Sequence, residues 1–148
     1  MIKCRTKLGW IVSPWLSLVV VACVAGCGDG RPQRVPVSGT VLIDGAPLSY
    51  GFVTFVPATG RSASGQLDKE GRFTLGSYAP GDGVTPGTQR VSVLARESLN
   101  DKQAKWHAPK KYKDHDTSGI VIEITEPTDD LQIDLSWGGE KPSIETNS

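Results

Sequence analysis

Cysteine is scarce in this sequence, and it is unevenly distributed. The chain of 148 residues contains three cysteines, Cys4, Cys23 and Cys27, so none follows residue 27. Residues 28–148 therefore offer no disulfide within the chain, no thiol nucleophile and no cysteine ligand for a metal ion. A domain in this part of the chain must be stabilised by its hydrophobic core alone.

The sequence also lacks an excess of positive charge. Sixteen Lys and Arg residues balance sixteen Asp and Glu residues, and three of the basic residues, Lys3, Arg5 and Lys7, lie before residue 27. Taking these three from sixteen leaves 13 basic against 16 acidic residues in 27–148, a net charge of about −3. Nucleic-acid binding requires a basic surface, so we expect no nucleic-acid partner.

Residues for hydrolytic or metal chemistry are few. The chain has two histidines, His107 and His115, and no serine lies in a nucleophile-elbow motif. Asp114 and Asp116 flank His115, but neighbouring side chains of an extended segment point to opposite sides. We therefore predict no catalytic residues, no metal site and no cofactor. A metal-dependent adhesion module that uses this Asp-His-Asp loop is an alternative.

The first 26 residues have the pattern of a secretory signal. A basic start is followed by an apolar run over residues 8–21, which only Ser13, Pro14 and Ser17 interrupt. The run ends at Val24-Ala25-Gly26-Cys27, which resembles a bacterial lipobox. Small residues before the cysteine let the peptidase approach the backbone, and only a thiol forms the thioether to diacylglycerol.

The lipobox predicts that residues 1–26 are a lipoprotein signal peptide and that Cys27 is lipidated. Two or more acyl chains give a stable membrane anchor. We expect a cell-envelope protein, anchored in a membrane through Cys27 and facing the periplasm or the exterior. Cys23 is a poorer candidate, because cleavage there would leave an unusual Val-Ala-Gly after the cysteine.

Two other interpretations of this segment are an uncleaved transmembrane helix and an ordinary signal peptide. The apolar stretch over residues 8–26 is near the lower limit of a span, about 17 to 25 residues. Pro14 weakens it further as a helix. Lipidation of Cys27 is thus the favoured interpretation.

The remainder divides into a tether, one domain and a tail. Residues 27–36 are rich in glycine and proline and predict a flexible tether. Residues 138–148 have neither a helical nor a strand period, and we expect a disordered tail. The domain is therefore expected over residues 37–137, a length that suits a single core.

The domain is predicted to be all-β. Apolar residues recur at every second position, and no convincing helical run is present. We expect seven strands, near residues 35–43, 52–56, 63–67, 72–75, 90–95, 120–125 and 131–136. Two antiparallel sheets packed face to face bury the apolar side of each strand, which predicts a β-sandwich. Residues 97–118 are polar and predict a long loop.

Several turn and strand motifs resemble a known family, the carboxypeptidase regulatory-like (transthyretin-like) domain. They are Gly39, Asp44-Gly45-Ala46-Pro47-Leu48, Gly51-Phe52-Val53-Thr54-Phe55, Asp68 with Gly71 and Phe73, and Pro86-Gly87. The rest of the chain looks like short bacterial lipoproteins that carry this domain alone. The resemblance implies a seven-stranded Greek-key β-sandwich and a non-catalytic role. Gln89 departs from the family, which often has an aromatic residue there.

One cluster of basic and aromatic residues is a candidate partner-binding surface. It consists of Trp106, Lys110, Lys111, Tyr112 and Lys113. Aromatic rings and cations together can contact sugars or anionic polymers. The alternative is that Trp106 and Tyr112 dock the loop onto the sandwich.

These patterns predict a lipid-anchored, non-enzymatic lipoprotein that acts as a binding or structural module for an envelope protein or glycan. An enzyme similar to the hydroxyisourate hydrolases, which share the transthyretin-like fold, is an alternative. That family is characterised by an N-terminal histidine and a C-terminal Tyr-Arg-Gly-Ser. This chain has no histidine before His107 and closes with Ile144-Glu-Thr-Asn-Ser148.

Overall fold

The computed structural model of the chain describes residue 30 and residues 33–146. The predicted signal peptide and Cys27 lie outside this part. Within it, the secondary structure consists of β-strands and one 3-10 turn, η2 (Lys110–Lys113), with no α-helix. The all-β prediction is therefore confirmed for the described residues.

Eleven strands are present in the described residues. They are β1 (Val37–Ile43), β2 (Ala46–Pro47), β3 (Phe52–Pro57), β4 (Ala63–Gln66), β5 (Arg72–Thr74), β6 (Gly87–Leu94), β7 (Arg96–Asn100), β8 (Gln103–Trp106), β9 (Ile120–Ile124), β10 (Thr128–Leu135) and β11 (Ser143–Thr146). The seven predicted strands correspond to β1, β3, β4, β5, β6, β9 and β10.

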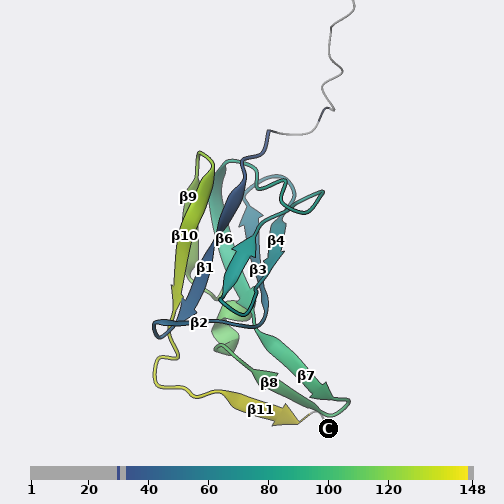
Figure 1. Ribbon diagram of the computed structural model, residues 1–148, viewed down its shortest axis with the longest axis vertical. Coiled ribbons are helices and arrows are strands. Elements are labelled where there is room, and N and C mark those ends of the chain that lie inside the picture. The colour runs from purple at the N-terminus through teal and green to yellow at the C-terminus, as the bar shows by residue number, and fades with distance from the viewer. Residues whose placement is uncertain (1–29, 31–32, 147–148) are drawn as a thin grey trace, which may run out of the picture. The chain divides into compact units, whose positions relative to one another are not determined.

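Two of the sheets face each other (Figure 1). In the first, β1 pairs with β10 along one edge, and β2 and β5 share its other edge. In the second, the order is β4-β3-β6-β9 and every pairing is antiparallel. The β1–β10 pairing is parallel, which is possible because β10 reaches β1 only after the chain has built the second sheet.

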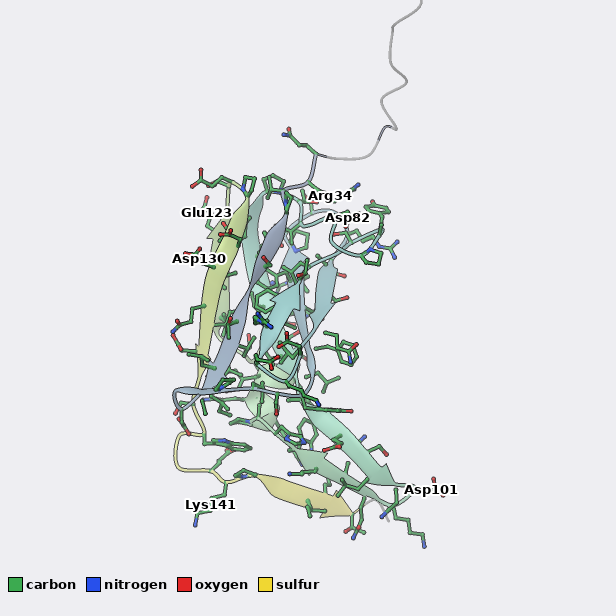
Figure 2. All side chains as sticks on the ribbon, viewed as in Figure 1. Arg34, Asp82, Asp101, Glu123, Asp130 and Lys141 are labelled. Atoms are coloured by element: carbon green, nitrogen blue, oxygen red, sulfur yellow. The ribbon has the colours of Figure 1, made fainter. Side chains whose placement is uncertain are left out.

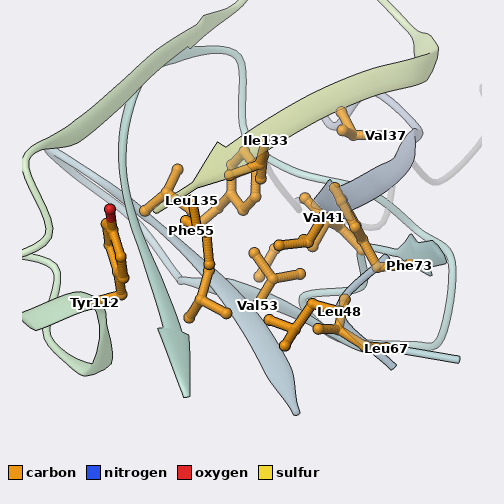
Figure 3. Close-up of a cluster of buried hydrophobic side chains, with 14 of the residues drawn as sticks. Val37, Val41, Leu48, Val53, Phe55, Leu67, Phe73, Tyr112, Ile133 and Leu135 are labelled. Atoms are coloured by element: carbon orange, nitrogen blue, oxygen red, sulfur yellow. The ribbon is translucent and has the colours of Figure 1, made fainter. Parts of the chain in front are cut away.

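Alternation of side chains places the core between these sheets. Ile133 and Leu135 of β10 are buried, while Gln132 before them and Asp134 between them are exposed. Val41 of β1 contributes to the same cluster, in which Figure 3 shows side chains from both sheets in contact. The predicted inward parity is therefore confirmed. Apolar burial contributes about 25 cal/mol per Å², so these faces supply the main stabilisation.

The turn between β4 and β5 forms as its residues predict. Gly71 has a φ of 73°, and a Cβ there would lie 2.7 Å from the Val41 carbonyl oxygen. The Asp68 carboxylate accepts hydrogen bonds from the backbone N–H groups of Glu70 and Arg72, at 2.9 and 2.8 Å. The Arg72 N–H is the main cause of a lowered pKa of Asp68. The turn is fixed by local chemistry, but β5 pairs with β1 and β4 pairs with β3, so the two strands belong to different sheets and do not form a hairpin.

Gln89 points into the core. The side chain is 1% exposed, and its Nε2 donates to the Thr85 carbonyl oxygen at 2.7 Å and to the Gly87 carbonyl oxygen at 3.4 Å. The amide thus satisfies carbonyl groups of the turn before β6 from inside the protein.

The predicted tether is shorter than residues 27–36. Val35 exchanges backbone hydrogen bonds with Val84, at 2.9 and 3.0 Å, and its side chain belongs to the core. Just before it, Arg34 Nε lies 3.2 Å from Asp82 Oδ2 (Figure 2 labels both). The domain therefore begins by Arg34, because these residues find partners on the loop over residues 76–84.

A third sheet occupies segments that were expected to be irregular. It has the order β11-β8-β7 and follows directly from β6 (Figure 1). Residues 97–118, predicted as a loop, thus contain most of β7, all of β8 and η2, and the predicted disordered tail contains β11. These strands show little apolar alternation because most of their side chains are exposed, so their pairing rests mainly on backbone hydrogen bonds.

We predict that Ile133→Asp unfolds the domain. The side chain is 2% exposed, and burying an unpaired carboxylate costs several kcal/mol, comparable with a total stability of about 5 to 15 kcal/mol. Gln132→Ala, one residue away on the exposed face, is the control and should leave the midpoint of chemical denaturation nearly unchanged. Equal losses for the two variants would contradict the register.

Candidate binding site

The predicted cluster of basic and aromatic residues lies where β8 leads into η2. Its two rings are interior: Trp106 is 6% exposed and Tyr112 is 7% exposed. Tyr112 belongs to the core cluster, as the docking alternative expects, whereas Trp106 lies against Glu145 and lines the hollow described below. The ammonium groups of Lys110, Lys111 and Lys113 belong to exposed residues, as predicted.

Tyr112 attaches η2 to the end of β10. Its ring lies at one end of the core cluster, near Leu135 (Figure 3). Its hydroxyl donates to the Ser136 carbonyl oxygen at 3.3 Å and accepts from the Ser136 N–H at 3.2 Å. Lys111 Nζ lies 4.7 Å from the centre of the Tyr112 ring. The buried ring thus positions two flanking lysines, Lys111 and Lys113, on the surface.

Glu145 of β11 is the partner of both Trp106 and Lys110. Trp106 Nε1 donates to Glu145 Oε2 at 2.9 Å, and Lys110 Nζ donates to Glu145 Oε1 at 2.7 Å. These hydrogen bonds, that of Lys110 first, lower the pKa of Glu145 below its ordinary value. Lys110 Nζ also lies 5.4 Å from the centre of the Trp106 ring. One carboxylate therefore joins three segments.

A small hollow adjoins this junction. Its volume is about 150 Å³, and its lining includes Trp106, Lys110, Lys111, Trp137, Glu140 and Lys141. Lys141 lies on the chain between β10 and β11 (Figure 2). The hollow thus combines the predicted lysines with residues of the predicted tail.

Sequence reasoning missed Trp137 and Lys141 as members of this site. They are about 30 residues from the predicted cluster, and pairing of β11 with β8 brings them together. One signal was available, because a tryptophan followed by two glycines is unusual in a disordered tail. Gly138 and Gly139 adopt φ values of 60° and 92° and form a turn in which the Glu140 N–H donates to the Trp137 carbonyl oxygen at 2.9 Å.

Two wider grooves lie on the sandwich itself. One, of about 540 Å³, is lined by Ser38, Thr40, Gln66, Arg72 and Thr74, and the other, of about 720 Å³, runs between β4 and the loop over residues 76–81. Arg72 in the first groove is already paired with Asp68 and Glu70. Both grooves are open, and neither combines aromatic rings with unpaired cations in the way the small hollow does.

The histidines face carboxylates in the described structure. His107 Nε2 lies 2.8 Å from Glu97 Oε2, and the His107 and Tyr50 ring centres are 5.2 Å apart. His115 lies 3.6 Å from both Asp114 and Asp116. In the part of the chain that the structure describes, neither histidine ring forms a hydrogen bond with a hydroxyl group.

The Asp114, His115 and Asp116 side chains lie closer together than an extended chain allows. One ligand atom of each can be chosen so that all lie within 4.8 Å of one another. The reason is a turn, in which the Asp116 N–H donates to Asp114 Oδ1 at 3.0 Å. Asp116 also forms an ion pair with Arg90, a cation that competes with a metal ion for its carboxylate.

Comparisons of the chain with protein-family models, with curated proteins and with solved structures find no match. The resemblance to the carboxypeptidase regulatory-like domain therefore stays a prediction from the motifs. Within residue 30 and residues 33–146 we find no helix with the length and hydrophobicity of a membrane span.

Acid should release β11 from β8. Because the folded pKa of Glu145 is lowered, its contribution to stability is complete above the ordinary carboxyl pKa and is lost as the pH falls through the folded value. Below about pH 4 we expect the amides of residues 143–146 to lose protection, measured as their exchange rate relative to the intrinsic rate at the same pH. Glu145→Ala should show this loss of protection at pH 7, while Glu140→Ala should not. If the protection of these amides changes neither with pH nor in Glu145→Ala, Glu145 does not hold β11 to β8.

Proposed function

We propose that this protein is a lipid-anchored, non-enzymatic lipoprotein of the cell envelope that serves as a binding or structural module for protein or glycan. The observation that carries the proposal is the sequence Val24-Ala25-Gly26-Cys27 at the end of a basic and then apolar segment. Cys27 would be the lipidated residue and residues 1–26 the signal peptide.

The described domain is consistent with such an anchor. Arg34, which is tied to Asp82, follows Cys27 by seven residues. Seven residues span at most about 25 Å when fully extended. In this proposal the domain therefore works close to the membrane surface. With no cysteine after Cys27, the thiol needed for lipidation is not duplicated in the domain.

We also propose that the sandwich is the seven-stranded Greek-key, transthyretin-like type of the carboxypeptidase regulatory-like family. The family-like motifs coincide with turns and close approaches. Asp44 and Gly45 connect β1 to β2 with φ values of 47° and 82°. A Cβ on Gly51, just before β3, would lie 2.6 Å from the Leu94 carbonyl oxygen. Backbone conformation and close packing therefore explain these motif residues without a catalytic role.

The non-enzymatic part of the proposal is supported by the surroundings of the histidines. His107 is paired with Glu97, and His115 lies between two carboxylates. Neither arrangement places a base beside a nucleophile, as acyl transfer requires. The alternative of a hydroxyisourate-hydrolase-like enzyme has no support in these contacts.

The alternative of a metal-dependent adhesion module is testable at Asp114, His115 and Asp116. A ligand that binds only the folded state raises the melting temperature in proportion to the logarithm of its concentration. Because Arg90 already neutralises Asp116, we expect neither calcium nor zinc at millimolar concentration to shift the melting temperature. A metal-dependent rise that Asp114→Ala abolishes would favour the adhesion module.

We predict that Cys27→Ser abolishes metabolic labelling of the protein with a radioactive or clickable fatty acid. The serine hydroxyl cannot form the thioether, so the protein should appear either as an uncleaved precursor or in the soluble fraction. Cys23→Ser is the matched control and should be labelled normally. Absence of label in the unchanged protein would reject the lipid anchor. Label that persists in Cys27→Ser but is lost in Cys23→Ser would show that Cys23, and not Cys27, is the lipidated residue.

A further inference from the structure

We propose that the hollow next to Glu145 binds one anionic, carboxylate-bearing sugar unit of an envelope glycan. The hollow is lined by Trp106, Trp137, Lys111 and Lys141 among others. This inference rests on the proposed function, because it specifies the partner of the envelope module.

The size of the hollow suits one sugar ring. Its volume is about 150 Å³. Pockets for drug-sized ligands measure about 300 to 1,000 Å³, so this hollow suits a smaller group, such as a single pyranose unit. The site would therefore recognise one unit of a longer polymer.

The aromatic lining suits the apolar face of a sugar. Both tryptophans of the described residues, Trp106 and Trp137, line this one hollow. Trp106 is buried and held by Glu145, so it forms a rigid wall. Trp137 is half-buried and leaves part of its ring open. The exposed part of such a ring offers an apolar contact with little conformational entropy to lose.

The charges of the lining favour an anion. Lys110, Lys111 and Lys141 face a single carboxylate, Glu140, in the lining itself. Lys110 is neutralised by Glu145. Among the described residues, no carboxylate oxygen lies within 4.0 Å of Lys111 or Lys141.

These unpaired cations occur in a segment, 27–148, whose net charge is about −3. A local positive site in an acidic domain attracts an anionic ligand without binding polyanions over the whole surface. A sugar carboxylate placed at the lysines, with its ring against Trp137, satisfies both features of the lining.

Binding can be measured through the fluorescence of the two tryptophans that line the hollow. The full-length lipoprotein, purified in a neutral detergent, is titrated with trigalacturonate, with maltotriose or with sodium sulfate while tryptophan fluorescence is recorded. We expect a saturable change with trigalacturonate, weakened by added salt because exposed charges are screened within about 8 Å at physiological ionic strength. Maltotriose should bind about tenfold more weakly or not at all, and sulfate should give no saturable change. Trp137→Phe should remove most of the signal, which assigns the change to the hollow, because Trp10 and Trp15 lie in the proposed signal peptide and would be absent from the processed lipoprotein.

Matched variants test the geometry. Lys111→Ala should weaken binding about three-fold, as expected for the loss of one exposed ion pair, whereas Lys113→Ala, which removes a lysine of the same turn outside the hollow, should not. Trp137→Ala should weaken binding about tenfold with an unchanged melting temperature. If Trp137→Ala lowers the melting temperature, the affinity of Trp137→Phe measured by calorimetry replaces it: binding close to that of the unchanged protein supports stacking, because the phenyl ring keeps an apolar face, and loss of binding contradicts it.

Three results would overturn the inference: no saturable change with trigalacturonate, equal binding of maltotriose, or equal binding of sulfate, which would reveal an unspecific anion site. Equal effects of Lys111→Ala and Lys113→Ala would also overturn it. The assay contains no membrane. If trigalacturonate does not bind but Cys27 is labelled with fatty acid, only the sugar site is rejected. If trigalacturonate binds but Cys27 is not labelled, only the anchor is rejected.

Discussion

Burial of the facing sides of two sheets is the constraint on which this structure depends. No cysteine follows Cys27, so no covalent bond can replace core packing in the domain. β1 is central to this packing, because β10 pairs along one of its edges and β2 and β5 share the other. Its inward residues Val37 and Val41 contact the same cluster as the inward residues of β3 and β6. Every other element is placed relative to this pair of faces.

The third sheet has a different physical basis. β7 and β11 are mostly exposed, and the attachment of this sheet relies on polar contacts at its ends. Glu145 holds β11 to Trp106 and Lys110, and Tyr112 joins η2 to Ser136. These bonds involve an acidic group with a lowered pKa and one exposed lysine, so we expect this region to respond to pH and salt more than the core does. The candidate sugar site lies where the two regions meet.

The parts of the structure that could be predicted are those determined by residues close together in the sequence. Alternation identified the seven sandwich strands, and Asp68 and Gly71 form a tight turn, because both patterns act within a few residues. β7, β8 and β11 were missed, since polar strands are stabilised by partners far away in the sequence. The same reason explains the site: the lysines were found as a cluster, while Trp137 reaches them only through the β11–β8 pairing. Asp114 to Asp116 were judged as an extended segment, and a turn brings them together.

The parallel pairing of β1 with β10 has a mechanical consequence. The chain enters β1 next to Arg34 and Val35, and it leaves β10 at Leu135 towards Trp137. Because the strands are parallel, a membrane anchor that pulls at the start of β1 and a bound polymer that pulls beyond the end of β10 act in opposite directions along neighbouring strands. The hydrogen bonds between Gly39 and Ile43 on one strand and Leu131 and Leu135 on the other would then carry the force together, in shear, instead of opening one after another. If the chain is anchored and bound as proposed, this geometry would resist tension along the line from the anchor to the ligand.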